Sequence, residues 1–287
     1  LPSPHRLRCF QSAFLTAGKD LDNRWKYEIP AYRVAPHVWN VGGQDDVCAY
    51  LLDSGEGLIL IDTGYEQTLY MLIDRMWRIG FDPKNIKMIL LSHWHGDHVN
   101  GCRFLKEMSG AEVWLSAVDE EQHQLHKDDT HPQRIVPYTV DHLYDDSKPI
   151  ELGRFQIHTR LCPGHTPGAT SFRFDDTDEE TGQTYHCAMH GGLGVFPMMA
   201  PETLAKNGQS EEQAHRFVRD CLEMAQWDVD IMLASHLNQG NVLPNIPKDT
   251  NDYHVFVAGY AWGDILRNRA RAVMDLYPDT YPPRENE

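Results

Sequence analysis

Four potential metal ligands lie within six consecutive residues of this chain: His93, His95, Asp97 and His98. His93 and His95 are two residues apart, so an extended segment projects both imidazoles to one side. Gly96 permits a sharp turn, which can bring Asp97 and His98 round to the same volume. One loop can therefore supply ligands to two adjacent metal ions. Imidazoles with a single carboxylate are typical of zinc, with iron and manganese left open.

Two further histidines come directly after apolar segments, as His93 does. His165 follows residues 156–161 and stands in a loop dense in proline and glycine, whereas His236 follows residues 230–234. Sites in open α/β sheets form at strand ends. One loop cannot complete two tetrahedral sites, so His165 and His236 are the candidates for the missing ligands.

The segments that must position these residues fall into two similar halves. Residues 47–61 predict a hairpin that ends at Asp62, residues 65–79 predict a helix with one apolar face, and residues 86–91 predict a buried strand. The second half has a similar order. A strand at 156–161 is followed by a hairpin at 170–189, a helix at 210–226 and a short strand at 230–234. The pattern indicates a duplicated α/β architecture.

We expect one domain over residues 1–287. Its core runs from about 32 to 241, with an N-terminal extension at 1–31 and a C-terminal helical segment at 242–287, where residues 255–277 have a helical pattern. The polar segment 117–131 contains His123 and His126 beside Asp119. Together with Glu120 and Glu121 these residues could bind a metal, but the polar composition favours a solvated helix face.

Together these motifs are similar to those of the metallo-β-lactamase superfamily. The resemblance runs from about residue 32 to about residue 241 and rests on HWHGDH at 93–98, PGHTPG at 163–168, LILIDTG at 58–64, and a late Ser-His pair at 235–236. It implies an αββα sandwich with a metal site at the shared edge of two sheets. It assigns His93, His95 and His165 to a first metal and Asp97, His98 and His236 to a second. Asp62 matches the carboxylate that orients a ligand imidazole or the ligand loop.

The chain departs from one feature of that superfamily. Many of its hydrolases carry a bridging aspartate after the second hairpin, whereas here His190 stands about at that position, before two glycines. The third subclass of metallo-β-lactamases also lacks a bridging protein ligand, and the motifs are closest to that subclass. We expect His190 to be a further ligand, a hydrogen-bond donor in the pocket or a structural residue, with a position facing the pocket favoured.

Charge and composition exclude several other classes of protein. The 26 Lys+Arg against 42 Asp+Glu give a net charge of −16, so nucleic acid is not an expected partner. No apolar run reaches the roughly 18–20 residues of a membrane helix. The six cysteines include no CxxC pair and predict reduced thiols, as in the cytoplasm. A secreted chain with its signal removed would look the same. The sequence leaves the oligomeric state open.

The implied reaction is metal-assisted hydrolysis of a small-molecule substrate. Two zinc ions would share a water and generate a hydroxide, which attacks an amide or lactam carbonyl. Asp97 would bind the second metal and position the hydroxide or relay its proton, and the chain has no GxSxG nucleophile motif. A lactone or thioester hydrolase of the same fold is the first alternative, although such enzymes usually keep the bridging aspartate. A diiron redox module is the second, and it would usually have an attached flavin domain.

Overall fold

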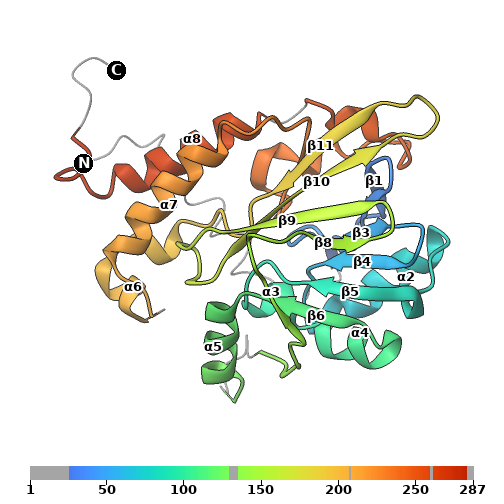
Figure 1. Ribbon diagram of the computed structural model, residues 1–287, viewed down its shortest axis with the longest axis horizontal. Helices are drawn as coiled ribbons and strands as arrows, with labels where there is room; N and C mark the ends of the chain where they lie inside the picture. The colour runs from blue at the N-terminus through green and yellow to red at the C-terminus, as the bar shows by residue number, and fades with distance from the viewer. Residues whose placement is uncertain (1–25, 129–134, 207, 259–260, 283–287) are drawn as a thin grey trace.

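The computed structural model describes residues 26–128, 135–206, 208–258 and 261–282, and its strands form two β-sheets (Figure 1). The first sheet contains, in spatial order, β1 (Tyr32–Ala35), β2 (Val38–Asn40), β3 (Tyr50–Asp53), β4 (Leu58–Ile61), β5 (Ile86–Leu90), β6 (Glu112–Leu115) and β7 (His142–Leu143). The second contains β12 (Ile231–Leu233), β11 (Thr184–Met189), β10 (Thr170–Thr177), β9 (Phe155–Leu161) and β8 (Ile150–Leu152).

Strand β4 shows why the two sheets form layers. Its side chains alternate between two cores, because successive residues of a strand point to opposite faces. Ile59 and Ile61 enter the core that contains Phe172 of β10, so they face the second sheet. Leu58 and Leu60 enter the other core, on the opposite face. Both faces of β4 are therefore buried, which accounts for its continuous apolar sequence.

Helices cover the outer face of each sheet, which completes the four layers seen in Figure 1. The described α-helices are α2 (Leu69–Arg78), α3 (Gly96–Val99), α4 (Cys102–Ser109), α5 (Ala117–His126), α6 (Pro201–Lys206), α7 (Glu211–Met224) and α8 (Trp262–Met274). Leu72 of α2 and Leu105 of α4 share a core with Leu60 of β4. Phe217 of α7 and Leu266 of α8 pack in the core of the second sheet. The predicted αββα sandwich is confirmed.

The strands that precede the ligand loops end along one side of the molecule. In the first sheet β4 and β5 are parallel. In the second, β9 and β11 are both antiparallel to β10, and β12 is parallel to β11. Backbone hydrogen bonds join the sheets at this edge, including those from Thr170 to the Ser92 carbonyl at 2.8 Å and from Cys48 to the Ser235 carbonyl at 2.9 Å.

The structure corrects several predicted boundaries. The predicted helix 65–79 begins with a 3₁₀ turn at Glu66–Thr68, and α2 follows it. The stretch predicted as one helix at 255–277 contains the end of a 3₁₀ turn, Tyr253–Phe256, and then α8. Within the described residues no helix is long and apolar enough to cross a lipid bilayer.

Candidate metal centre

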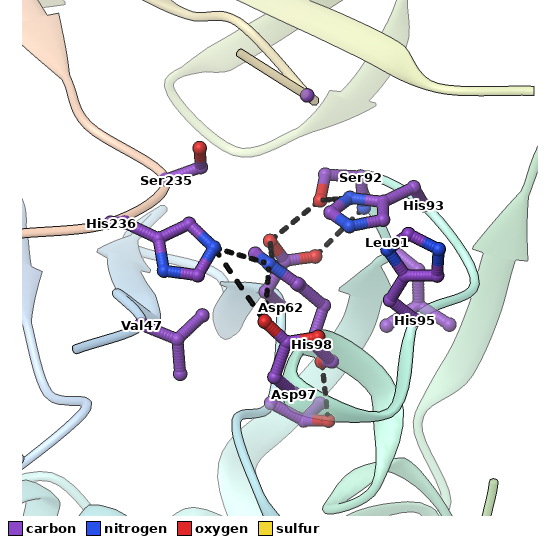
Figure 2. Close-up of polar contacts among 12 residues, drawn as sticks. Val47, Asp62, Leu91, Ser92, His93, His95, Asp97, His98, Ser235 and His236 are labelled. Atoms are coloured by element: carbon purple, nitrogen blue, oxygen red, sulfur yellow. Dashed lines mark hydrogen bonds and ion pairs between the residues drawn. The ribbon is translucent and has the colours of Figure 1, made fainter. Parts of the chain in front are cut away.

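The loop after β5 carries four of the six predicted ligands. His93 and His95 lie in its extended part, and His95 itself has φ −64° and ψ 145°. The helical turn α3 begins at Gly96 and turns Asp97 and His98 back toward the same region (Figure 2). The structure thus realises the predicted geometry, with two side chains from an extended segment and two from the turn that follows.

The first cluster brings His165, from the loop after β9, against the β5 loop. The Nδ1 atom of His95 lies 3.1 Å from Nε2 of His165. The ring centroids of His93 and His165 are 4.8 Å apart. One ligand atom from each of these three histidines falls within 4.8 Å of the others. Since Nδ1 of His165 is bonded to the Gly194 carbonyl at 2.9 Å, its Nε2 carries the free lone pair.

The second cluster joins α3 to the segment after β12. The Nε2 atoms of His98 and His236 lie 3.2 Å apart. The Oδ2 atom of Asp97 is 3.4 Å from Nε2 of His98 and 3.6 Å from Nε2 of His236. Both histidines use their other ring nitrogen on a carboxylate, so their Nε2 atoms face each other and Asp97.

These groups fit divalent metal ions. Nε2 of His93 is buried and has no hydrogen-bond partner, while its Nδ1 contacts the Ser92 hydroxyl at 2.9 Å. Buried polar atoms without a partner are rare, and each one requires an explanation. A metal ion bound at Nε2 supplies one, and imidazole nitrogens with a single carboxylate form a transition-metal ligand set.

The surroundings keep the first cluster in its metal-binding form. Burial, together with the neighbouring His98, lowers the pKa of His93 well below its usual range. Burial also lowers the pKa of His95 to about 4. At His98 burial acts in the same direction, but Asp97 and Asp62 outweigh it and raise the pKa to about 10. Neutral imidazole is the form that binds metals, so the first cluster presents its lone pairs without having to lose protons.

Asp62, at the end of β4, holds the β5 loop. It is fully buried and has φ of 59°, a conformation uncommon outside glycine but tolerated by aspartate. Its carboxylate accepts hydrogen bonds from the Ser92 amide and hydroxyl, both at 2.7 Å, and contacts Nδ1 of His98 at 2.8 Å. The structure therefore places Asp62 behind the ligand loop, where the motif implied a carboxylate.

A second carboxylate of this kind is Asp46, which the sequence analysis did not identify. Its Oδ1 lies 3.1 Å from Nδ1 of His236, and its Oδ2 accepts a hydrogen bond from the Tyr65 hydroxyl at 2.7 Å. The Leu237 amide also donates to the backbone carbonyl of Asp46 at 2.7 Å. Asp46 and His236 are 190 residues apart, and no local pattern around Asp46 marks this contact.

The predicted solvated face of segment 117–131 is wrong for two of its residues. Asp119 and His123 are fully buried, and the His123 ring stacks on Tyr138 at 4.0 Å. The His126 ring stacks on Trp94, between the first two predicted ligands, at 4.9 Å. Burial raises the pKa of Asp119 to about 7, while hydrogen bonds from the ligand loops oppose the rise. Helix α5 thus packs against the candidate metal centre. Residues 129–131 of the segment lie outside the described residues.

His190 is not brought into the cluster, contrary to the position that we favoured. Its Nδ1 accepts a hydrogen bond from the Gly192 amide at 3.1 Å, and its Nε2 contacts the Cys221 sulfur at 3.7 Å. Its ring packs edge-on against Phe217 of α7. Burial lowers the pKa of His190 to about 3, so the ring stays neutral. Of the three roles that the sequence left open, the structural one agrees with these contacts.

Comparisons with known proteins agree with this geometry. Residues 42–178 match the family model of the metallo-β-lactamase superfamily. A hydroxyacylglutathione hydrolase from Haemophilus influenzae is 28% identical over 165 residues, which cover 55% of this chain and 74% of that protein.

Solved structures match over a longer stretch. A β-lactamase from Chitinophaga pinensis is 25% identical with a TM-score of 0.76, covering 90% of this chain and 98% of that one. A subclass B3 metallo-β-lactamase of Bradyrhizobium japonicum is 19% identical with a TM-score of 0.73, covering 90% and 96%. At 19% identity, the similarity to the Bradyrhizobium japonicum structure shows a shared fold alone.

Proposed function

We propose that this chain, which belongs to the metallo-β-lactamase superfamily, is a zinc-dependent hydrolase that opens an amide or lactam carbonyl of a small molecule. In this proposal each chain holds two zinc ions. The first is held by His93, His95 and His165, and the second by Asp97, His98 and His236.

The protein's own contribution to this reaction is to place charges and protons. Bound zinc would polarise a substrate carbonyl and lower the pKa of a water toward neutrality. Asp97 lies within reach of both clusters, since it groups with His93 and His98 and also approaches His236. We assign it the positioning of the attacking water and the acceptance of its proton. Asp62 and Asp46 fix the imidazoles of His98 and His236 through their Nδ1 atoms.

The orientation of His190 carries the choice of substrate class. Thioester and lactone hydrolases of this fold usually have a bridging aspartate after the second hairpin. Here that strand ends in a histidine whose two ring nitrogens are engaged by Gly192 and Cys221. Without a bridging carboxylate, a two-metal site carries one more unit of positive charge. Such a site favours substrates with a carboxylate beside the scissile carbonyl, as β-lactams have.

A thioester hydrolase is the second candidate. The observation in its favour is the similarity to the hydroxyacylglutathione hydrolase, which covers 74% of that protein. The two candidates share the proposed metal ligands and differ in the carbonyl that is attacked.

A parallel hydrolysis screen separates them. Zinc-loaded protein is assayed on a chromogenic cephalosporin, a homoserine lactone and a glutathione thioester, with His93→Ala as the control for contaminating activity. We expect the cephalosporin to give the highest kcat/KM and His93→Ala to abolish it. Thioester turnover exceeding cephalosporin turnover would transfer the assignment to the second candidate. No metal-dependent turnover of any of the three would contradict the proposed function.

A further inference from the structure

The carboxylate of Asp119 connects the two loops that carry the ligands of the proposed first site. Its Oδ2 accepts hydrogen bonds from the Trp94 amide at 3.1 Å and from the Thr166 hydroxyl at 2.8 Å. Its Oδ1 accepts one from the Gly168 amide at 2.6 Å. Trp94 stands between His93 and His95, and Thr166 follows His165, so one side chain holds both sides of the three-histidine cluster.

The first turn of α5 is built for this close approach. Ser116 caps the helix by accepting a hydrogen bond from the Asp119 amide at 3.2 Å. A methyl group on Gly168 would lie 2.1 Å from the Ser116 hydroxyl oxygen and 2.6 Å from Oδ1 of Asp119. Only a residue without a side chain allows the loop after β9 to come this near. The close contact therefore depends on two residues, the buried carboxylate of Asp119 and the glycine at position 168.

We propose that Asp119 is a positioning residue that sets the distance between the β5 loop and the loop after β9, and thereby the geometry of the first metal site. This inference rests on the metal ligands assigned under the proposed function. Asp119 touches none of the proposed ligand atoms, so it acts through the backbone that carries them. Tight metal binding requires ligand distances to hold within roughly 0.2 Å, which makes the spacing of two separate loops a direct determinant of affinity.

An asparagine at position 119 shows why the carboxylate is required. All three neighbours donate, and a carboxylate can accept on both oxygens, whereas an amide has one oxygen and one NH₂ group. If the NH₂ group takes the place of Oδ1, it faces the Gly168 amide donor at 2.6 Å. If it takes the place of Oδ2, the Thr166 hydroxyl can turn to accept, but the Trp94 amide loses its partner. The first orientation breaks one of the two contacts with the loop after β9, and the second breaks the contact with the β5 loop.

Asp46 provides the matching perturbation on the other metal. It contacts His236, a ligand assigned to the second site. Asp176 provides a control away from both sites. It is a buried carboxylate on β10 that binds the His37 amide and Nδ1 at 2.7 and 2.8 Å, near the opposite end of the strand from Thr170.

The test measures the affinity of each site rather than turnover. Metal-free protein is titrated with zinc in competition with a chromophoric chelator, and ¹¹³Cd²⁺ NMR identifies the two sites, because three nitrogens and a mixed nitrogen–oxygen set give separate resonances. The variants are Asp119→Asn, Thr166→Val, Thr166→Ser, Asp46→Asn and Asp176→Asn. The thermal midpoint of each metal-free variant reports the loss of stability alone.

We expect Asp119→Asn to weaken the first site by about 10- to 100-fold, the usual effect of removing a group that supports a ligand. The second site should change by less than about threefold. Thr166→Val should weaken zinc binding at the same site by a smaller factor. Thr166→Ser should bind zinc there as tightly as wild type, because serine keeps the hydroxyl. Asp46→Asn should weaken zinc binding at the second site more than at the first. Asp176→Asn should lower the thermal midpoint without changing the zinc affinity of either site.

Two outcomes would overturn the inference while leaving the proposed function intact. One is wild-type binding of two zinc ions with unchanged affinities in Asp119→Asn. The other is an equal loss at both sites that follows the thermal midpoint, since a purely structural role predicts it. Wild-type protein that binds no zinc would instead contradict the proposed function, and with it the ligand assignment on which the inference depends.

Discussion

Replacing Gly194 by alanine should remove one metal and leave the other. A methyl group on Gly194 would lie 2.7 Å from Nδ1 and 2.8 Å from Cε1 of His165. Ordinary van der Waals contact begins near 3.4 Å, so the ring must move by about 0.7 Å. That displacement is more than three times the roughly 0.2 Å that a metal–ligand distance tolerates. The same methyl group also disturbs the hydrogen bond that fixes Nδ1 of His165 to the Gly194 carbonyl.

The assay is elemental analysis of dialysed protein, together with the kinetics of substrate hydrolysis. We expect the zinc content of Gly194→Ala to fall from two toward one per chain, with loss of hydrolysis. Overpacking should also cost about 1–3 kcal/mol of folding stability. Gly80→Ala is the matched control. It has φ of 90° and open space around it, so an alanine there loses about 1–2 kcal/mol through backbone strain but touches no ligand. Gly194→Ala protein that retains both metals would refute the assignment of His165.

Three further predictions follow from the same geometry. His93→Ala should lose metal and hydrolysis, whereas His254→Ala, at an exposed position, should keep both; equal loss in elemental analysis would show that the ligand set is misassigned. His190 has a pKa of about 3 in the folded protein against 6.5 normally, so the unfolded state takes up the proton first and stability falls as pH drops below 6.5. Urea unfolding at pH 6.5 and 5.0 should therefore show wild type losing up to about 2 kcal/mol more than His190→Gln, at about 1.4 kcal/mol per pH unit; parallel losses would contradict a buried neutral ring. Removing the metals with a chelator should lower the thermal midpoint, because zinc at 1,000 times its Kd stabilises by about 4 kcal/mol; an unchanged midpoint in scanning calorimetry would count against bound metal.

The layered fold was predictable from local patterns because apolar periodicity reports how many faces are buried. The unbroken apolar run of β4 requires cover on both sides, and the one-faced pattern of α2 requires a sheet beneath it. Strand β7 was not predictable. It consists of His142 and Leu143 paired with Trp114 and Leu115, so its pairing depends on where the preceding chain leaves it rather than on its own residues.

The candidate site, like the fold, was predictable from the sequence only in part. Four of the six proposed ligands lie in one short segment, and the other two follow strands of the same kind, so spacing and strand ends mark them as candidates. Residues that contact the proposed ligands were predictable only where a motif contained them, as with Asp62. Asp46 contacts His236 across 190 residues, and Asp119 contacts Gly168 across 49. Contacts at such separations leave no periodic trace in the sequence.

Asp119 was assigned to a solvated face because polar residues in a helix are usually exposed. The assignment failed because the loops at the strand ends have backbone amides that no sheet can satisfy. The amides of Ser92, Trp94 and Gly168 all point into the protein, and a buried amide requires an acceptor. Asp62 and Asp119 are those acceptors, with two amides bound by Asp119 and one by Asp62. A loop that leaves the regular sheet therefore needs buried carboxylates nearby, and by our inference the aspartates that bind its amides also fix the spacing of the proposed ligands.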